Sequence, residues 1–158
     1  GSAPKHVQQL NEQDHLRWDS RGEFCALGGS LIFLADAKGN EKARVLGKAV
    51  EKATQGILDH DRSPSRKVGE PDNRDSHYWF ARYWAEALAD QDQDAGLAAH
   101  FAPIAEALAA GEAQILSELA AVQGRPAELG GYYHPDAART AAVMRPSETL
   151  NAIIGHPA

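Results

Sequence analysis

The sequence predicts an all-α fold. Apolar residues recur at spacings of three and four along most of the 158-residue chain, which is the period of an amphipathic helix. Ala, the residue with the highest helix propensity, is frequent. No stretch alternates apolar and polar residues with the β-branched enrichment that is typical of strands. We therefore expect helices that are joined by loops.

Two helices are predicted near residues 20–38 and 41–59. Ser20 and Glu23 have the spacing of a capping box at the start of the first helix, and Gly39 would end it. Asn40 can cap the second helix. The apolar residues that share one face of each helix are Phe24, Leu27, Leu31, Leu34 and Ala35 in the first, and Ala43, Leu46, Val50, Ala53 and Ile57 in the second.

Five further helices are predicted, near residues 76–90, 95–101, 103–123, 136–144 and 147–154. Asp75 or Ser76 can cap the first of them, which carries a stripe of aromatic residues. Pro103 suits the first turn of a helix, so a separate short helix is expected before it. Gly124 closes the long helix, and Pro146 separates the last two.

Length and composition limit the class of protein. At this size one compact unit is expected, and 43% hydrophobic with 24% charged residues excludes a disordered chain. No run reaches the ~18 apolar residues of a membrane span and no leader opens the chain, so we expect a cytoplasmic protein without a membrane partner. The single Cys25 excludes an internal disulfide. Gly1-Ser2 has the composition of a cloning scar, which implies a native chain that continues upstream.

Charge is unevenly distributed along the chain. The net charge of −6 argues against general nucleic-acid affinity. Residues 1–75 contain twelve basic and twelve acidic side chains, whereas the whole negative excess falls in residues 76–158. Any anion site is therefore expected in the first half.

Cationic side chains gather at loops and helix starts of that half. Ser63-Pro64-Ser65-Arg66-Lys67 combines two hydroxyls and two cations, a composition that suits phosphate oxygens or plain solvation. Lys5-His6 and Arg17-Trp18-Asp19 add two more cationic sites. An Arg beside an Asp can recognise the 2′-phosphate and a ribose hydroxyl of an adenosine, although Asp19 can equally be a helix cap. The sequence has no G-x-G-x-x-G loop, so a Rossmann site is excluded within these residues.

Five motifs follow one another over nearly the whole chain. They are Lys5-His6-Val7-Gln8-Gln9, His15-Leu16-Arg17-Trp18-Asp19-Ser20, Ser63-Pro64-Ser65-Arg66-Lys67-Val68-Gly69, Asp72-Asn73-Arg74 with Ser76-His77, and Gly130-Gly131-Tyr132-Tyr133-His134-Pro135-Asp136. Their order and spacing resemble the C-terminal part of the monomeric type of NADP-dependent isocitrate dehydrogenase, whose intact chain is several times longer. Arg21 and Asp75 depart from the residues that are usual in that family.

The resemblance implies the helical C-terminal part of the smaller domain of a larger α/β enzyme. It implies that Lys5, His6, Arg17 and Arg66 match the family's site for the 2′-phosphate of NADP, and that Asp19 matches a position on the adenosine side. No catalytic or metal-binding residue is matched in this chain, because the family's Mg²⁺ or Mn²⁺ ligands and its isocitrate-binding groups lie upstream.

The reaction implied for the intact, monomeric enzyme of the tricarboxylic acid cycle and glyoxylate bypass is the oxidation of isocitrate by NADP⁺ to 2-oxoglutarate, CO₂ and NADPH. The segment alone is expected to be inactive, since the N-terminal and central parts of the same chain are missing. Its uncovered apolar surface would favour self-association. Two alternatives stay open: a free-standing helical module that binds an anionic ligand or partner through its basic loops, and a structural subdomain with solvated loops.

Overall fold

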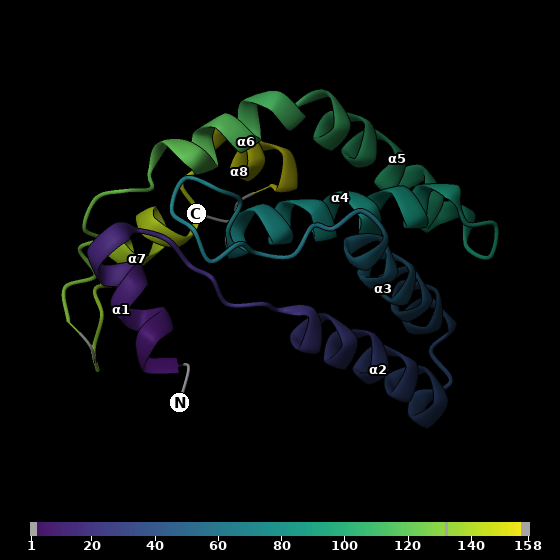
Figure 1. Ribbon diagram of the computed structural model, residues 1–158. Coiled ribbons are helices and arrows are strands. Elements are labelled where there is room, and N and C mark those ends of the chain that lie inside the picture. Colours follow the sequence, from purple (N-terminus) through teal and green to yellow (C-terminus); the bar gives the residue numbers. More distant parts are fainter. Residues whose placement is uncertain (1–2, 132, 156–158) are drawn as a thin grey trace. The chain divides into compact units, whose positions relative to one another are not determined.

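The computed structural model describes residues 3–131 and 133–155, so that residues 1–2, 132 and 156–158 lie outside the described part. Within those residues the chain forms eight helices and no strand, which confirms the all-α fold class (Figure 1). Length favoured one compact unit, and the contacts among the residues divide the chain into two. Unit 1 comprises residues 1–18, 63–76 and 111–158, and unit 2 comprises residues 19–62 and 77–110. No helix in the described ranges is long and apolar enough to cross a bilayer.

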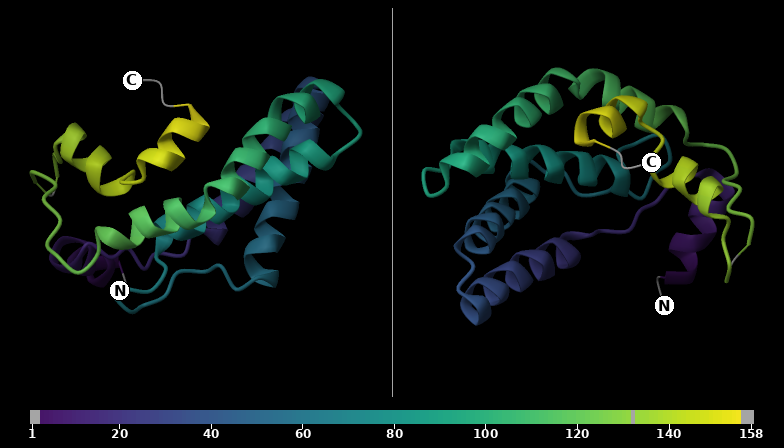
Figure 2. Two further views of the ribbon diagram at one scale, coloured as in Figure 1. Left: turned by 90° about the horizontal axis from the view of Figure 1, so that it is seen from above. Right: turned by 180° about the vertical axis from the view of Figure 1, so that it is seen from behind.

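Helices α2 (Arg21–Lys38) and α3 (Glu41–Asp59) form one side-by-side pair in unit 2 (Figure 2). Two glycines bring the helix backbones together: a Cβ on Gly28 would lie 3.1 Å from Val50 Cγ1, and one on Gly47 would lie 2.9 Å from Ile32 Cδ1. The Asn40 side chain caps α3 by accepting the N–H of Ala43 at 3.1 Å. The second helix therefore starts where its local cap dictates.

Two predictions for α2 are wrong. Ser20 is the N-cap residue, but its side chain makes no cap hydrogen bond, because its φ and ψ of −89° and 14° are not the extended conformation that a capping box needs. Leu27 and Leu34 are 38% and 41% exposed. The buried face of α2 runs instead through Phe24, Gly28 and Ala35.

Helix α4 (Asn73–Asp90) begins three residues earlier than the sequence indicated. Its cap is Asp72 and not Asp75 or Ser76: the Asp72 carboxylate accepts the N–H of Arg74 at 2.8 Å, while Asp75 accepts the N–H of Asp72 at 2.8 Å. This reciprocal pair has the geometry of a capping box with an Asp in place of Glu. The part of α4 that belongs to unit 2 carries the buried aromatic side chains Tyr78, Trp79 and Phe80.

Helices α5 (Ala95–Ala110) and α6 (Glu112–Ala121) divide differently from the prediction. Pro103 lies inside α5 and does not start a new helix. A proline removes one helical hydrogen bond, and the Ala-rich residues around it keep the helix continuous. The break falls at Gly111, which is the N-cap of α6.

Unit 1 contains α1 (Ala3–Gln13), α7 (Ala137–Met144) and α8 (Glu148–Ile154) besides α6. Helix α1 was not predicted, because Leu10 is its one buried residue and the sequence shows no apolar stripe there. Backbone bonds of 2.8 and 2.9 Å tie its end, at Gln13 and Asn11, to Gly124 and Ala127. Helices α7 and α8 follow the caps Asp136 and Ser147.

Candidate anion-binding site

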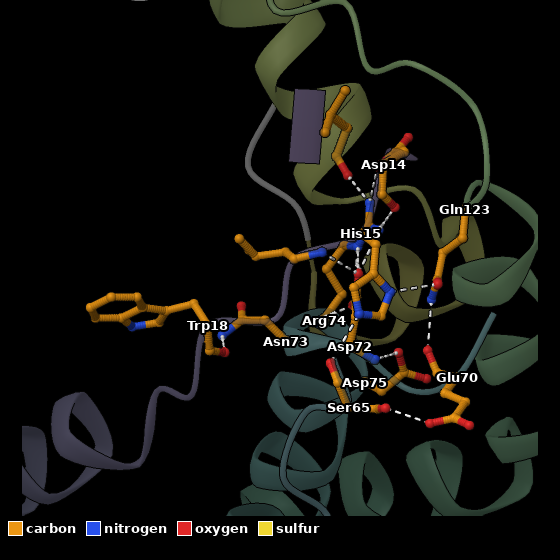
Figure 3. Close-up of polar contacts among 12 residues, drawn as sticks. Asp14, His15, Trp18, Ser65, Glu70, Asp72, Asn73, Arg74, Asp75 and Gln123 are labelled. Carbon is orange, nitrogen blue, oxygen red and sulfur yellow. Dashed lines mark hydrogen bonds and ion pairs between the residues drawn. The ribbon is translucent and has the colours of Figure 1, made fainter. Parts of the chain in front are cut away.

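A buried polar network in unit 1 surrounds the side chain of Arg74, which is 3% exposed (Figure 3). The guanidinium forms ion pairs of 2.8 Å with Asp14 and 2.6 Å with Asp72. It also donates to the carbonyl oxygens of Asp14 at 2.7 Å and Val143 at 2.8 Å. Burying Arg74 is tolerable because five oxygens accept hydrogen bonds from its N–H groups. The network thereby joins α7, the end of α1 and the start of α4.

The same network fixes the backbone on both sides of Arg17. Asp72 accepts the N–H of Leu16 at 3.1 Å, and the N–H of Asn73 donates to the carbonyl of Leu16 at 2.8 Å. The Asn73 side chain donates to the carbonyl of Trp18 at 2.8 Å. Since the residues before and after it are both held, Arg17 emerges from an ordered stretch of backbone.

A second set of contacts orders the loop that contains Arg66. The buried ring of His15 meets the carbonyl of Ser65 at 2.9 Å and the Gln123 side-chain oxygen at 2.7 Å. That oxygen also accepts the N–H of Gly69 at 2.8 Å, and the Gln123 amide donates to the carbonyl of Glu70 at 3.1 Å. These bonds lie on both sides of Arg66 and connect its loop to the residues that follow α1 and α6.

Four of the five predicted site residues belong to unit 1, and we call Lys5, His6, Arg17 and Arg66 the cationic group. Burial, then the positive charges of Arg17 and Arg66, lower the pKa of His6, so both guanidiniums lie near its ring. The His6 ring also contacts Trp18 edge-on, with centroids 5.3 Å apart. Lys5 and Arg17 share a surface pocket of about 240 Å³. The structure therefore brings together residues that are up to 61 positions apart in the sequence.

Three buried polar atoms around the cationic group have no hydrogen-bond partner in the part of the chain that the structure describes. They are His6 Nδ1, Arg17 Nε and Gln9 Oε1. Buried polar atoms are nearly always paired, so three of them close together indicate a place for the polar groups of a ligand. The Arg17 N–H is a donor that suits an anionic oxygen, whereas Gln9 Oε1 is an acceptor that suits a hydroxyl or amine.

Gln9 is the site residue that the sequence analysis missed. Its side-chain amide donates to the carbonyl of Arg66 at 3.1 Å and so ties α1 to the loop of Arg66. A signal was available, because Gln9 follows His6 by three positions and therefore shares its face of the helix.

Asp19 belongs to unit 2 and has a local role there. Its carboxylate accepts the backbone N–H of Arg21 at 3.1 Å and forms a 2.8 Å ion pair with the guanidinium of the same residue. Asp19 thus satisfies the first N–H of α2, as the helix-cap alternative expected. Its matched position on the adenosine side of a cofactor stays a prediction.

No group of three or more His, Cys, Asp or Glu side chains that could hold a metal ion is found among residues 3–131 and 133–155. Cys25 is an exposed free thiol. The candidate site in unit 1 consists of the cationic group and the polar atoms of His6, Gln9 and Arg17 that have no partner among the described residues.

Comparison with known proteins gives one consistent family. A family model described as monomeric isocitrate dehydrogenase matches residues 1–155. The chain is 54% identical over 154 residues to isocitrate dehydrogenase (NADP) 2 of Mycobacterium tuberculosis and to the isocitrate dehydrogenases (NADP) of Corynebacterium glutamicum and Azotobacter vinelandii. Each match covers 98% of this chain and 21% of the relative, so the chain spans about a fifth of the length of these relatives.

Proposed function

Because this chain belongs to the monomeric isocitrate dehydrogenase family, as its five motifs predicted, we propose that it is the segment that recognises the 2′-phosphate of NADP in a longer isocitrate dehydrogenase. That longer protein would oxidise isocitrate with NADP⁺ to 2-oxoglutarate and CO₂ and release NADPH. One observation carries the proposal: the buried N–H of Arg17, which has no hydrogen-bond partner among the described residues, lies in one group with the His6 ring and the guanidinium of Arg66.

The guanidiniums of Arg17 and Arg66 would each donate charge-assisted hydrogen bonds to phosphate oxygens, worth about 1.5 to 3 kcal/mol apiece. Among the described residues the Arg17 Nε has no hydrogen-bond partner to give up, so a phosphate would gain this bond without breaking another. Lys5 is exposed and would add a hydrated charge at the rim. Gln9 Oε1 would accept a hydrogen bond from a hydroxyl or amine of the adenosine, since it cannot donate to phosphate.

The choice between NADP and NAD distinguishes a 2′-phosphate site from a module that binds any anion. NAD has the same adenosine as NADP but lacks the 2′-phosphate, so the cationic group should discriminate between the two cofactors. A module that binds anions through solvated basic loops would show no such preference. The divalent metal and the isocitrate-binding groups that the resemblance implies would belong to the part of the longer protein outside this segment, which spans 21% of the relative's length.

The experiment is Arg17→Asp in the longer protein, with Kd for NADP and for NAD measured by calorimetry. Truncation of Arg17 is expected to weaken NADP by roughly 10- to 150-fold. The Asp variant should weaken it further, because its carboxylate repels phosphate, while NAD affinity is retained. Arg125→Asp makes the same charge change at an exposed loop position of unit 1 and is the matched control. An unchanged NADP-to-NAD preference in Arg17→Asp would refute the assignment.

A further inference from the structure

His6 lies in a setting that favours the neutral form of its ring before a ligand binds. Its Nδ1 is buried and has no hydrogen-bond partner in the described part of the chain. Two charged groups from other segments act on the ring, and both are cations. Arg17 lies in the stretch that follows α1, and Arg66 lies in the loop before α4. On α1 itself Lys5 precedes it, and the carboxylate of Glu12 is bonded to Gln8 at 3.0 Å.

A phosphate that binds between these cations would reverse the charge that His6 experiences. A phosphate monoester has its second pKa near 6, so it is almost wholly a dianion at about pH 7.5. The two negative charges would offset the guanidiniums, and a phosphate oxygen would give a protonated Nδ1 the acceptor that it lacks. The ligand therefore favours the imidazolium form of a ring that is neutral without it.

We infer that His6 takes up a proton from solvent when the 2′-phosphate binds beside Arg17 and Arg66, so that NADP binding is coupled to pH and NAD binding is not. The inference rests on the proposed function. The step is a simple protonation: the Nδ1 lone pair accepts the proton, and no other bond forms or breaks.

The direction of the pH dependence follows from whether the free or the NADP-bound protein binds the His6 proton more tightly. Burial, Arg17 and Arg66 lower the pKa of His6 in the free protein, and the bound dianion raises it. NADP affinity is then greatest at low pH within this range and falls as pH rises from the free to the bound pKa, by at most about tenfold per pH unit. NAD affinity stays level. A rise in pH therefore reduces the ratio of NADP affinity to NAD affinity.

The test is calorimetry of NADP binding to the longer protein at about pH 7.5 in two buffers of different ionisation enthalpy, which gives the number of protons exchanged. Wild type should take up roughly 0.5 to 1 proton per NADP and none per NAD. His6→Gln keeps a polar side chain that cannot titrate, and its uptake should vanish. His100→Gln, which changes an exposed histidine of unit 2, should behave as wild type.

The possible results distinguish a failure of the inference from a failure of the proposed function. Proton uptake that is equal in wild type and His6→Gln overturns the inference, as does net proton release in wild type, which is the sign that the phosphate itself would give on losing its proton. If Arg17→Asp nevertheless weakens NADP and spares NAD, the proposed function survives that failure. If Arg17→Asp leaves the preference unchanged, both fall. Uptake that is present in wild type and His100→Gln but absent in His6→Gln supports the inference.

Discussion

Asp75 is a buried carboxylate with no ion-pair partner among the residues that the structure describes. Its side chain accepts the N–H of Asp72 at 2.8 Å, and the residue is 5% exposed. Burial raises the pKa of Asp75 from 3.8 to about 6, and the nearby charge of Asp72 adds to this, against the opposing effects of the Asp72 N–H and of Arg74. We predict that Asp75→Asn stabilises the protein at neutral pH.

The magnitude follows from the pKa. A rise from 3.8 to about 6 corresponds to about 3 kcal/mol, at 1.36 kcal/mol per pH unit. Because the folded state holds this proton more tightly than the unfolded chain does, ionised Asp75 lowers the free energy of unfolding above about pH 6. The penalty disappears as pH falls from about 6 to about 4. Asn is neutral and its oxygen can still accept the Asp72 N–H, so the gain should be about 1 to 3 kcal/mol at pH 7.5 and near zero at pH 4.

The assay is urea unfolding of wild type and Asp75→Asn at a series of pH values, with the slopes compared to confirm two-state behaviour. Asp72→Asn is the control at the same site. It removes the 2.6 Å partner of buried Arg74 and should lower stability by about 3 to 5 kcal/mol at neutral pH. If Asp75→Asn is less stable than wild type at pH 7.5, or if the difference does not change with pH, then burial does not dominate the ionisation of Asp75.

Two further predictions concern packing and capping. Gly47→Ala should lower the free energy of unfolding by about 1 to 3 kcal/mol, because the new Cβ would lie 2.9 Å from Ile32 and 3.1 Å from the carbonyl of Gly28. The control is Gly29→Ala, whose Cβ meets no atom within 4 Å of the described structure. In the same thermal-melt comparison it should raise the free energy of unfolding by about 0.5 to 1 kcal/mol. Ser147→Ala should raise the pKa of Glu118, which hydrogen bonds led by that of Ser147 lower to about 2, and should speed amide exchange in α8. The stability that comes from this lowered carboxyl pKa is fully present above about pH 4.5 and is lost as the pH falls toward about 2. The Glu118 pKa can be measured by NMR titration. A pKa that is unchanged in the variant would contradict the role of the Ser147 hydrogen bond between α6 and α8.

Some helices could be located from local signals in the amino-acid sequence, and others could not. Asn40 marks the start of α3 because a cap acts within three residues of itself. The start of α4 was misplaced because Asp72, Asp75 and Ser76 are all suitable N-cap residues in the local pattern, and the hydrogen bonds from Arg74 to Asp72 and from Asp72 to Asp75 show which of them caps the helix. Helix α1 was missed for a related reason: its contacts with residues 124 and 127 hold it in place without an apolar stripe.

The candidate site, too, could be predicted only in part from the sequence. Lys5, His6, Arg17 and Arg66 were found because each lies in a motif that resembles the family, but no local pattern indicated that His6 lies near two guanidiniums from separate segments. The hydrogen bonds of Gln9, His15 and Gln123 that order the site, and those of Arg74 to Asp14 and Val143, join residues 50 to 108 positions apart in the sequence. Such contacts depend on the complete unit, and so they could be established only from the structure.

A chain with a net charge of −6 can still present a cationic site when the acidic side chains around it have other partners. Glu12 lines the pocket that contains Lys5 and Arg17, and it accepts a hydrogen bond from Gln8 at 3.0 Å. Two further carboxylates also have partners. Asp14 lies three residues before Arg17, yet its carboxylate pairs with buried Arg74 at 2.8 Å. Glu70 lies in the loop of Arg66, and it accepts a hydrogen bond from Ser65 and pairs with Lys67 at 3.5 Å. Because these interactions draw both carboxylates away from the two guanidiniums, the buried network does more than hold the backbone: it also leaves positive charge available for a phosphate, which the overall composition would not suggest.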